Sequence, residues 1–409
     1  MSLCRYLPTP SDRMGVIWTL LSAKGAVVLE YGPAGTTHFS VSMYGQMGVE
    51  PNQSLFTTHL SEDDIIMGDV TRLEEAIREI DKGYHPEVIF VVSSSVTSII
   101  GADIKGVCNY MEQEIDARLI PVDTGGFKGD YSLGMREGYN LLVKSFATEQ
   151  VEKKETTYNI LGASGCDYRM KSDLWELDSL MQEGFSYQVN AVLGIESSVK
   201  ALKELGAAKI NLVLREEALE AAKYLEKTYG TPYVYGGPYG YAGTAKWLKK
   251  VAEVIGKPVN QELQMKLRMR QMNTAGYKMY AAMYAHKENR PQAVIVGDVN
   301  RIQGFSEIFE EVCIPVTLKL SNHSLAGFDV EDIVKPAKER EKIKLLKEKT
   351  HSLVFGDDIS LYLCDDSCEK VVTSFPLIRS KQIAEHMPLM GIRGMDYILE
   401  AVDRYYGNL

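Results

Sequence analysis

Short runs of apolar residues alternate with glycine-containing turns and amphipathic stretches along the whole chain. Residues 88–92 form a continuous apolar run that ends in three serines, and residues 100–115 have the pattern of an amphipathic helix. Residues 119–122 form the next apolar run, which ends in Asp-Thr-Gly-Gly-Phe at 123–127. Short apolar strands that alternate with helices predict parallel sheets covered by helices on both faces.

This alternation occurs separately in three parts of the chain. A charged segment at 148–156 separates the first part from the second, and a long helical stretch at about 242–285 leads to the third. We therefore predict an α/β fold with three doubly wound, Rossmann-like domains at 1–150, 151–285 and 286–409, the last ending in a returning helix. In such domains, ligands bind beyond the carboxyl ends of the strands.

Composition and charge narrow the class of partner. The 409 residues are 45% hydrophobic, enough for several cores, and carry a formal net charge of −10. An acidic chain does not favour nucleic acid as a main partner, since phosphate binding needs a basic surface. No run approaches the roughly 20 apolar residues of a membrane span, and the first residues lack the pattern of a secretory signal. We expect a cytoplasmic protein.

None of the glycine-rich turns matches a nucleotide-binding fingerprint. The turn Gly-Ala-Ser-Gly at 162–165 lacks the third glycine of a dinucleotide motif, and the sequence contains no P-loop. The sequence therefore predicts no direct binding of ATP or NAD. The stretch at 233–241, rich in tyrosine and glycine, is a candidate cavity wall, although packing is the more common role of such residues.

Six cysteines are too sparse for a disulfide framework in a chain of this length. Cys108, Cys166 and Cys313 lie in helix or strand contexts, and we expect them to behave as small buried apolar residues. Cys364 and Cys368 form a close pair, but without a second pair or a nearby histidine they favour a loop or helix end over a metal site.

Two segments near the N-terminus carry the candidate chemistry. Cys4 is followed by Arg-Tyr-Leu-Pro, and residues 31–39 read Tyr-Gly-Pro-Ala-Gly-Thr-Thr-His-Phe after an apolar run. A buried strand that breaks into Gly-Pro-x-Gly brings its backbone close to a neighbouring group. We expect Cys4 to lie near Gly32–His38 and to face a partner subunit.

Motifs over most of the chain resemble the nitrogenase component 1-type oxidoreductase family, which includes the nitrogenase molybdenum-iron protein and the dark-operative protochlorophyllide reductases. Residues 67–77 are similar to the family's glycine turn and helix, and residues 85–104 to its next strand, cysteine loop and helix. Residues 120–139 match its phenylalanine-glycine loop closely, and 209–232 resemble its middle domain. The resemblance implies the three-domain fold and an iron–sulfur cluster held between two subunits.

The resemblance also assigns candidate ligand positions. Three cysteines per subunit can serve the interface cluster in the family, and here these positions fall on Cys4, Thr36 and Ser95. Neutral hydroxyls are poor iron ligands beside thiolates, so Cys4 alone is expected to ligate metal and the other two to face the cluster. The two positions that anchor the large nitrogenase cofactor fall near Val213 and Met390, which implies no such cofactor there.

Two alternatives stay open for the N-terminal residues. Cys4 is either a cluster ligand or a frayed N-terminal thiol without metal. His38 is a catalytic candidate, since it follows the loop directly and could ligate a cluster, donate a proton or cap the helix that begins there.

The leading functional expectation is a subunit of a nitrogenase-like two-component reductase. It would share an iron–sulfur cluster, of the 4Fe–4S type, with a homologous component 1-type subunit in a heterodimer or heterotetramer. It would take electrons from a separate ATP-dependent iron–sulfur reductase and pass them to a tetrapyrrole or another small molecule. The alternatives are a scaffold or maturase for metallocluster or cofactor assembly, and a metal-free binding subunit. Alone, the chain is expected to be catalytically silent.

Overall fold

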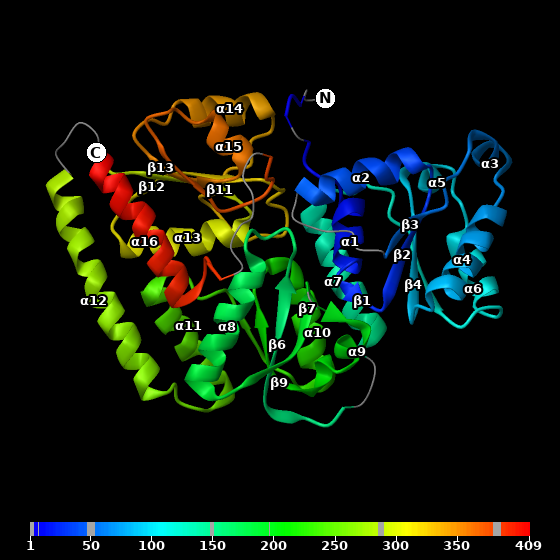
Figure 1. Ribbon diagram of the computed structural model, residues 1–409, viewed down its shortest axis with the longest axis horizontal. Coiled ribbons are helices and arrows are strands. Elements are labelled where there is room, and N and C mark those ends of the chain that lie inside the picture. The colour runs from blue at the N-terminus through cyan, green and yellow to red at the C-terminus, as the bar shows by residue number, and fades with distance from the viewer. Residues whose placement is uncertain are drawn as a thin grey trace. The chain divides into compact units, whose positions relative to one another are not determined.

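The chain folds into two compact units. The computed structural model describes residues 4–6, 8–46, 54–147, 151–195, 197–284, 290–378 and 386–409 (Figure 1). The smaller unit consists of Thr9–Val151 and Ala191–Gly206, and the larger unit of Met1–Pro8, Glu152–Asn190 and Ala207–Leu409. Among the described residues, no helix combines the length and the apolar character needed to cross a membrane.

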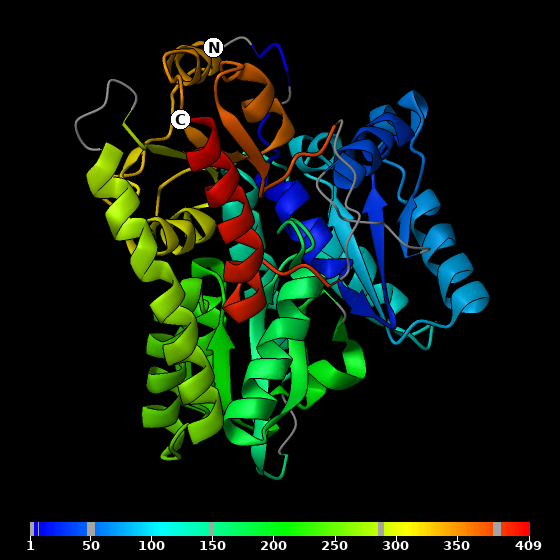
Figure 2. The same ribbon diagram turned by 60° about the vertical axis from the view of Figure 1, so that its left-hand side comes forward.

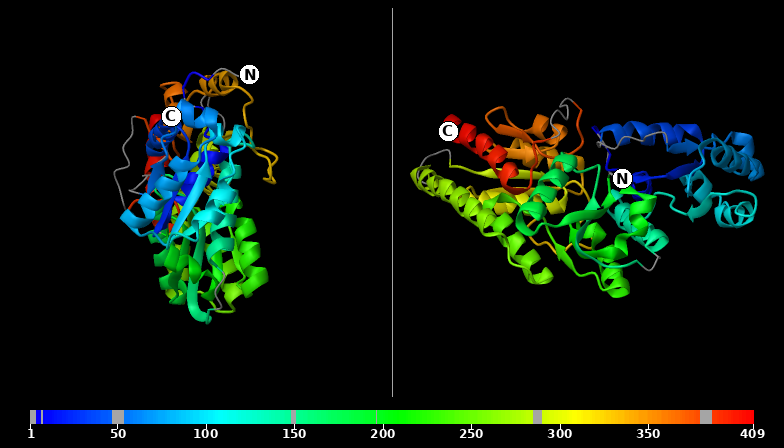
Figure 3. Two further views of the ribbon diagram at one scale, coloured as in Figure 1. Left: turned by 90° about the vertical axis from the view of Figure 1, so that its right-hand side faces the viewer. Right: turned by 60° about the horizontal axis from the view of Figure 1, so that its bottom comes forward.

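The smaller unit is built on a four-stranded sheet in the order β3-β2-β4-β5, in which every neighbouring pair is parallel. Strands β2 and β4 are buried along their whole length, which explains their unbroken apolar sequences, and they run side by side in the left view of Figure 3. The elements of the smaller unit are α1 Asp12–Leu20, β1 Ala23–Lys24, β2 Ala26–Tyr31, α2 Ala34–Gln46, β3 Leu55–Thr57, α3 Glu62–Met67, α4 Thr71–Tyr84, β4 Val88–Ser93, α5 Ser95–Ile99, α6 Ile104–Met111, β5 Arg118–Val122, α7 Tyr131–Phe146, β8 Ser197–Ser198, α9 Val199–Lys203 and the 3-10 turn Leu205–Ala207.

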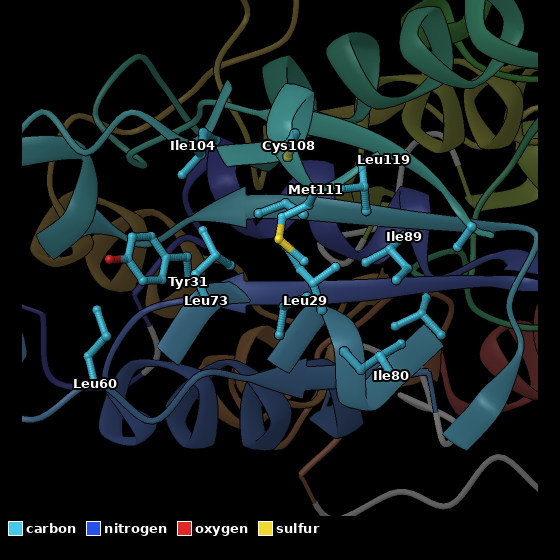
Figure 4. Close-up of a cluster of buried hydrophobic side chains, with 14 residues drawn as sticks. Leu29, Tyr31, Leu60, Leu73, Ile80, Ile89, Ile104, Cys108, Met111 and Leu119 are labelled. Atoms are coloured by element: carbon cyan, nitrogen blue, oxygen red, sulfur yellow. The ribbon is translucent and has the colours of Figure 1, made fainter. Parts of the chain in front are cut away.

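Helices α4 and α6 cover one face of this sheet. Their apolar faces contribute Leu73, Ile80, Cys108 and Met111 to a core that includes Leu29 of β2 (Figure 4). On α1 and α7 the helix backbones approach closely, because a Cβ on Gly134 would lie 1.8 Å from the carbonyl oxygen of Asp12. A larger residue at 134 would force the two helices apart.

The larger unit contains two further four-stranded sheets. Their strand orders are β10-β9-β6-β7 and β12-β11-β13-β14, and the pairs within β10-β9-β6 and within the whole second sheet are parallel. The last four residues of β7 belong to the smaller unit. The elements are β6 Lys154–Ala163, α8 Met170–Phe185, β7 Gln188–Gly194, β9 Ala208–Val213, the 3-10 turn Glu216–Ala218, α10 Leu219–Tyr229, β10 Tyr233–Tyr235, α11 Gly240–Ile255, α12 Gln261–Tyr284, β11 Ala293–Gly297, α13 Val299–Glu311, β12 Val316–Ser321, α14 Glu339–Lys347, β13 Leu353–Gly356, α15 Asp358–Leu363, β14 Glu369–Val372 and α16 Gly391–Asn408.

The predicted α/β fold with parallel sheets in each third of the chain is confirmed. The domain boundaries at 150 and 285 stay a prediction, since both residues lie outside the described part of the chain. The single helical stretch expected at 242–285 is instead two helices, α11 and α12. Gly256, at φ 68°, caps the C-terminus of α11 in the left-handed conformation, and Pro258 follows it.

The cysteine expectations hold with one exception. Cys108 and Cys166 are buried, whereas Cys313 is only half-buried and lies just after α13 at φ 57°. Cys364 and Cys368 are buried in the core beside β13, where their thiols donate to the carbonyl oxygens of Ser360 and Lys349 at 3.2 and 3.4 Å. Cys364 caps the end of α15 and Cys368 directly precedes β14, which agrees with the helix end or loop that their spacing favoured.

Candidate functional site

The loop after β2 uses its hydroxyl groups for internal hydrogen bonds. The Thr36 hydroxyl lies 2.8 Å from the Pro33 carbonyl oxygen and 3.1 Å from Glu30 Oε1, both acceptors for its single proton. Glu30 is fully buried, and its Oε1 also accepts a 2.6 Å hydrogen bond from Arg13 Nη1. The Gly-Pro-x-Gly turn is tight because a Cβ on Gly32 would lie 2.4 Å from the Cβ of Ser94. The group that this loop approaches closely is therefore Ser94, which follows β4 of the same sheet.

Ser95 is held in the same way. It is the first residue of α5, and its hydroxyl donates to the carbonyl oxygen of Gly125 at 2.7 Å. The adjacent Ser94 caps α5 by accepting from the backbone N–H of Thr97. Both Thr36 and Ser95 therefore have local hydrogen-bond partners, and neither supplies the thiolate that iron prefers.

His38 lies inside helix α2. The helix begins at Ala34, four residues earlier, so His38 does not cap it. Its side chain is exposed, and the neighbouring Phe39 is also exposed. An exposed imidazole on a helix is available to a partner or a solvent proton, but nothing in the described part of the smaller unit orients it as a catalytic base requires. Its catalytic role stays a prediction.

Cys4 belongs to the larger unit, where the carboxylate of Glu339 at the start of α14 binds the N-terminal segment. Glu339 Oε2 accepts from the Arg5 backbone N–H at 2.7 Å, and Oε1 accepts from the Tyr6 N–H at 3.1 Å and from the Cys4 thiol at 3.5 Å. Partial burial, and then the hydrogen bond to Glu339, raise the pKa of the Cys4 thiol. Because Thr36 and Ser95 belong to the other unit, the expected approach of Cys4 to Gly32–His38 stays a prediction.

A network of buried charges lies where three strands of the larger unit end. Arg215 follows β9 by two residues and contacts three carboxylates: Asp167 at 2.6 Å, Asp298 at 2.8 Å and Glu217 at 2.9 Å. Arg301 on α13 contacts Asp173 at 2.7 Å and lies 3.8 Å from Asp167. We refer to these six residues as the buried ion network.

Burial and the neighbouring cations shift the pKa values of the carboxyl groups in this network in opposite directions. Burial raises the pKa of the Asp167 carboxyl, and the nearby Arg215 and Arg301 only partly offset it. Burial would also raise the pKa of Glu217, but Arg215 and then His323 bring that pKa below its ordinary value. The two carboxyl groups thus shift in opposite directions, because Glu217 is more strongly stabilised in its charged form.

The two positions carried over from the nitrogenase cofactor converge on one turn. The Gly236 backbone N–H donates to the Val213 carbonyl oxygen at 2.9 Å, and a Cβ on Gly237 would lie 3.2 Å from Met390 Sδ. Val213 and Met390 are both buried. Among the described residues, no group of three or more His, Cys, Asp or Glu side chains is placed to hold a metal ion. These residues do not fit a thiolate- and imidazole-anchored metallocluster.

A groove opens beside this turn, at the carboxyl ends of β9 and β10. Its volume is about 330 Å³, at the lower end of the range for small-molecule sites. The Tyr235 hydroxyl donates to Asn300 Oδ1 at 3.1 Å, and Trp247 Nε1 donates to the Gly236 carbonyl oxygen at 2.9 Å. The groove is lined by Leu214, Tyr235, Gly236, Gly237, Tyr239, Gly243, Lys246, Trp247, Lys250, Asn300, Gln303, Gly304 and Glu307.

The sequence predicted part of this groove but not the buried ion network. The tyrosine- and glycine-rich stretch at 233–241 does form a cavity wall, as one of its two interpretations held. The signal for the buried ion network was present in single charged residues that directly follow apolar strands, Arg215 after β9 and Asp298 after β11. Their pairing across two sheets needed the fold.

Comparison with known proteins supports the family resemblance. The family described as nitrogenase component 1 type oxidoreductase matches residues 11–405. The nitrogenase iron-molybdenum cofactor biosynthesis protein NifE of Clostridium pasteurianum is 32% identical over 231 residues, 56% of this chain and 50% of the relative, so the match spans half of that relative's length. NifE of Methanosarcina barkeri is 25% identical over 378 residues, 85% of this chain and 80% of the relative.

A reductase component and a solved structure are also similar. A subunit of the light-independent protochlorophyllide reductase of Heliobacterium modesticaldum is 26% identical over 289 residues, 70% of this chain and 55% of the relative. A structure titled "Nitrogenase Cp1 at pH 6.5" superposes with a TM-score of 0.78 at 15% identity and covers 100% of this chain and 95% of its own, which supports the fold. The family match over nearly the whole chain shows that this protein belongs to the nitrogenase component 1 type oxidoreductase family.

Proposed function

We propose that this chain is a subunit of an assembly complex that holds a metallocluster or cofactor precursor and passes it on to another protein. The observation that carries the proposal is the ligand set. Thr36 and Ser95 are hydrogen-bonded hydroxyls, and Val213 and Met390 are buried apolar side chains. A protein that releases its cargo gains from the absence of tight thiolate and imidazole ligands. The two similar proteins named NifE, both cofactor biosynthesis proteins, support this function.

The groove beside Gly236 offers a way to hold such cargo without ligation. An iron–sulfur or organic-acid precursor is anionic. Lys246 and Lys250 place two exposed ammonium groups at the groove against one carboxylate, Glu307, so the charged lining is positive in sum. Tyr235 and Asn300 add hydrogen-bonding groups at the same place. Charge-assisted hydrogen bonds hold an anion with moderate affinity and permit its release.

The complex would contain a second component 1-type subunit. Cys4 is the one candidate thiol ligand that this chain contributes to a 4Fe–4S cluster shared with that subunit, which would supply the other ligands. An ATP-dependent iron–sulfur reductase would deliver electrons, and ATP hydrolysis would belong to it because this sequence contains no P-loop. These partners extend the proposal beyond the single chain.

The second candidate function is a catalytic subunit of a nitrogenase-like reductase. The similarity to the protochlorophyllide reductase of Heliobacterium modesticaldum favours it, as does a 26% identical match to the nitrogenase molybdenum-iron protein alpha chain of Clostridium pasteurianum. In that case the groove would take an organic substrate and the shared cluster would reduce it. The two functions differ in what leaves the complex, a cluster or a reduced substrate.

One preparation tests both functions. The chain is co-expressed anaerobically with a homologous subunit, and the complex is analysed for iron and sulfide. Transfer of iron to a cluster-free acceptor is then measured beside reduction of protochlorophyllide with an ATP-dependent reductase, each component being omitted in turn. Assembly predicts transfer without substrate reduction. Substrate reduction that needs all components would overturn the assembly function and establish the reductase.

Variants on α11 connect the groove to the cargo. Lys246→Ala with Lys250→Ala should lower the iron retained by the complex, because both ammonium groups lie at the groove. Lys249→Ala is the matched control, since Lys249 is on the same helix but faces Glu253 at 3.9 Å. Equal iron in all three preparations would remove the groove from the proposal.

A further inference from the structure

Helix α12 carries apolar residues on two opposite faces. On the inner face, Leu263, Leu267 and Tyr277 are buried, and the Tyr277 hydroxyl donates to Asp403 of α16 at 2.7 Å. Figures 1 and 2 show α12 beside α16. On the outer face, five methionines are between 59% and 75% exposed: Met265, Met269, Met272, Met279 and Met283. A helix that only covers its own unit needs one apolar face, so the second is available to a partner.

The outer methionines follow a coiled-coil repeat. With Gly276 they form a series, 265, 269, 272, 276, 279 and 283, whose spacings alternate between four and three residues. This is the repeat of the a and d positions that two helices bury against each other. The series extends over about 27 Å of helix at 1.5 Å per residue. We call these six residues the methionine seam.

We propose that the methionine seam binds the seam of a second copy of this chain in an antiparallel pair. The order of spacings is the same when read from either end, so a two-fold axis near position 274 superposes the seam on itself. Such an axis places Met265 opposite Met283 of the second copy and Met269 opposite its Met279. It also places Met272 opposite Gly276, where a Cβ would meet nothing within 4 Å in its own chain. Each Met272 side chain then fills the hole left by the other copy's glycine.

Charge selects the antiparallel arrangement. Lys266, Arg268 and Arg270 lie in the N-terminal half of α12 and Lys278 alone in its C-terminal half, and the helix has no acidic residue after Glu262. A parallel pair would place each of these cations beside its own copy. An antiparallel pair moves the three N-terminal cations to opposite ends and leaves one like-charge approach, between Arg270 and Lys278 of the second copy. Two of these cations are already neutralised within the unit, Lys266 by Glu183 and Arg270 by Asp396, each at 3.2 Å. The antiparallel pairing also opposes the two helix dipoles favourably.

The size of the seam sets the strength of the pair. One helix face of this length buries an area at the low end of specific interfaces, below about 1,200 Å² in total. Methionine side chains are flexible, so part of the burial free energy is offset by ordering them. We therefore expect a concentration-dependent dimer of the isolated chain.

Sedimentation velocity of the full chain, purified alone, tests the pairing over a concentration range of about 1 μM to 1 mM. The wild type should shift from monomer to dimer within this range. Met272→Glu with Met279→Glu should stay monomeric, because two carboxylates would be buried in the seam of each copy. Met67→Glu is the matched control: Met67 is 79% exposed on α3 of the smaller unit, and this change should leave the dimer intact. A wild type that stays monomeric at the highest concentration, or a double variant that still dimerises, overturns the proposal.

Cysteine cross-linking then tests the orientation. Cys4→Ala removes the exposed native thiol, and Met269→Cys and Met279→Cys are made in separate chains on that background. In the antiparallel pair, an equal mixture of the two chains oxidises to a mixed disulfide, since positions 269 and 279 face each other. A chain with Met269→Cys alone should cross-link weakly with itself, because in the antiparallel pair position 269 of one copy lies several residues along the helix from position 269 of the other. Efficient cross-linking of Met269→Cys with itself would show a parallel pair and overturn the proposed geometry.

Discussion

The candidate ligand positions of the two units have different surroundings. In the smaller unit, Thr36 and Ser95 bear hydroxyls that hydrogen-bond to groups of their own or neighbouring loops. In the larger unit, the residues around Val213 include Arg215, which is buried and paired with three carboxylates. A change at Thr36 or Ser95 therefore affects one or two local hydrogen bonds, whereas a change at Arg215 affects three buried ion pairs.

The two surroundings predict a different tolerance of substitution. A hydroxyl with one local hydrogen bond contributes about 1 kcal/mol, so a thiol in its place costs little. A buried guanidinium that compensates several carboxylates cannot be removed without leaving those charges unpaired in a medium of low polarity. We therefore expect substitutions in the buried ion network to cost more stability than substitutions at Thr36 or Ser95.

The largest effect is expected for Arg215→Met, which removes the cation that joins Asp167, Glu217 and Asp298. The free energy of unfolding should fall by about 3–5 kcal/mol, the usual result of breaking a buried ion pair from one side. Urea unfolding followed by circular dichroism measures it. Lys249→Met, which removes an exposed pair with Glu253, should change stability by less than about 0.5 kcal/mol. A similar small loss for Arg215→Met would show that the network is not structural.

Introducing the ligands that the family resemblance implies, one unit at a time, sharpens the comparison. Met390→His places an imidazole in a buried apolar site and should destabilise the chain by about 1–3 kcal/mol. Thr36→Cys removes a methyl group and exchanges the hydroxyl for a thiol at a half-buried position, and should cost about 1 kcal/mol or less. Both are measured by urea unfolding under reducing conditions. If the two changes cost the same, the units do not differ in the way proposed.

Opposite pH dependences are expected within the buried ion network. The folded pKa of Glu217 lies below its ordinary value, so its contribution to stability is present above the unfolded pKa and is lost as pH falls through the folded pKa. The folded pKa of Asp167 lies above its ordinary value, so its contribution is present at low pH and is lost as pH rises.

The urea midpoint of unfolding, measured at several pH values between about 3.5 and 7, checks the direction of each pH dependence. Glu217→Gln should lessen the loss of stability toward acid, and Asp167→Asn should increase it, because each change removes one of the two shifted groups. Each variant is the control for the other, and the two should change the slope of stability against pH in opposite directions. Slopes that change in the same direction would contradict the assignment of the shifts.

The fold was predictable from local patterns, whereas most of the site was not. Strands such as β4 have unbroken apolar sequences because both faces are buried, and this property is visible in any window of a few residues. The contacts of Arg215 join residues 48 and 83 positions away, and no local pattern encodes such a distance. The resemblance assigned Thr36 to a candidate ligand position. Only the structure shows that Glu30 and Pro33 accept the hydrogen bond of its hydroxyl.

The smallest effect concerns the reactivity of Cys4, the candidate ligand. Its thiol donates to Glu339 and its pKa is raised, so little thiolate is present near neutral pH. Glu339→Gln removes the negative charge beside the thiol and should speed alkylation by iodoacetamide at pH 8 several-fold, because the thiolate is the reacting species. Glu348→Gln, at the other end of α14, is the matched control and should leave the rate unchanged.

Mass spectrometry of the alkylated peptide measures the rate at Cys4 separately from the buried Cys108, whose pKa is raised to about 12 by burial and which should react only on unfolding. An unchanged rate in Glu339→Gln would mean that the carboxylate does not hold the thiol protonated, and Cys4 would then be free to bind metal without displacing Glu339.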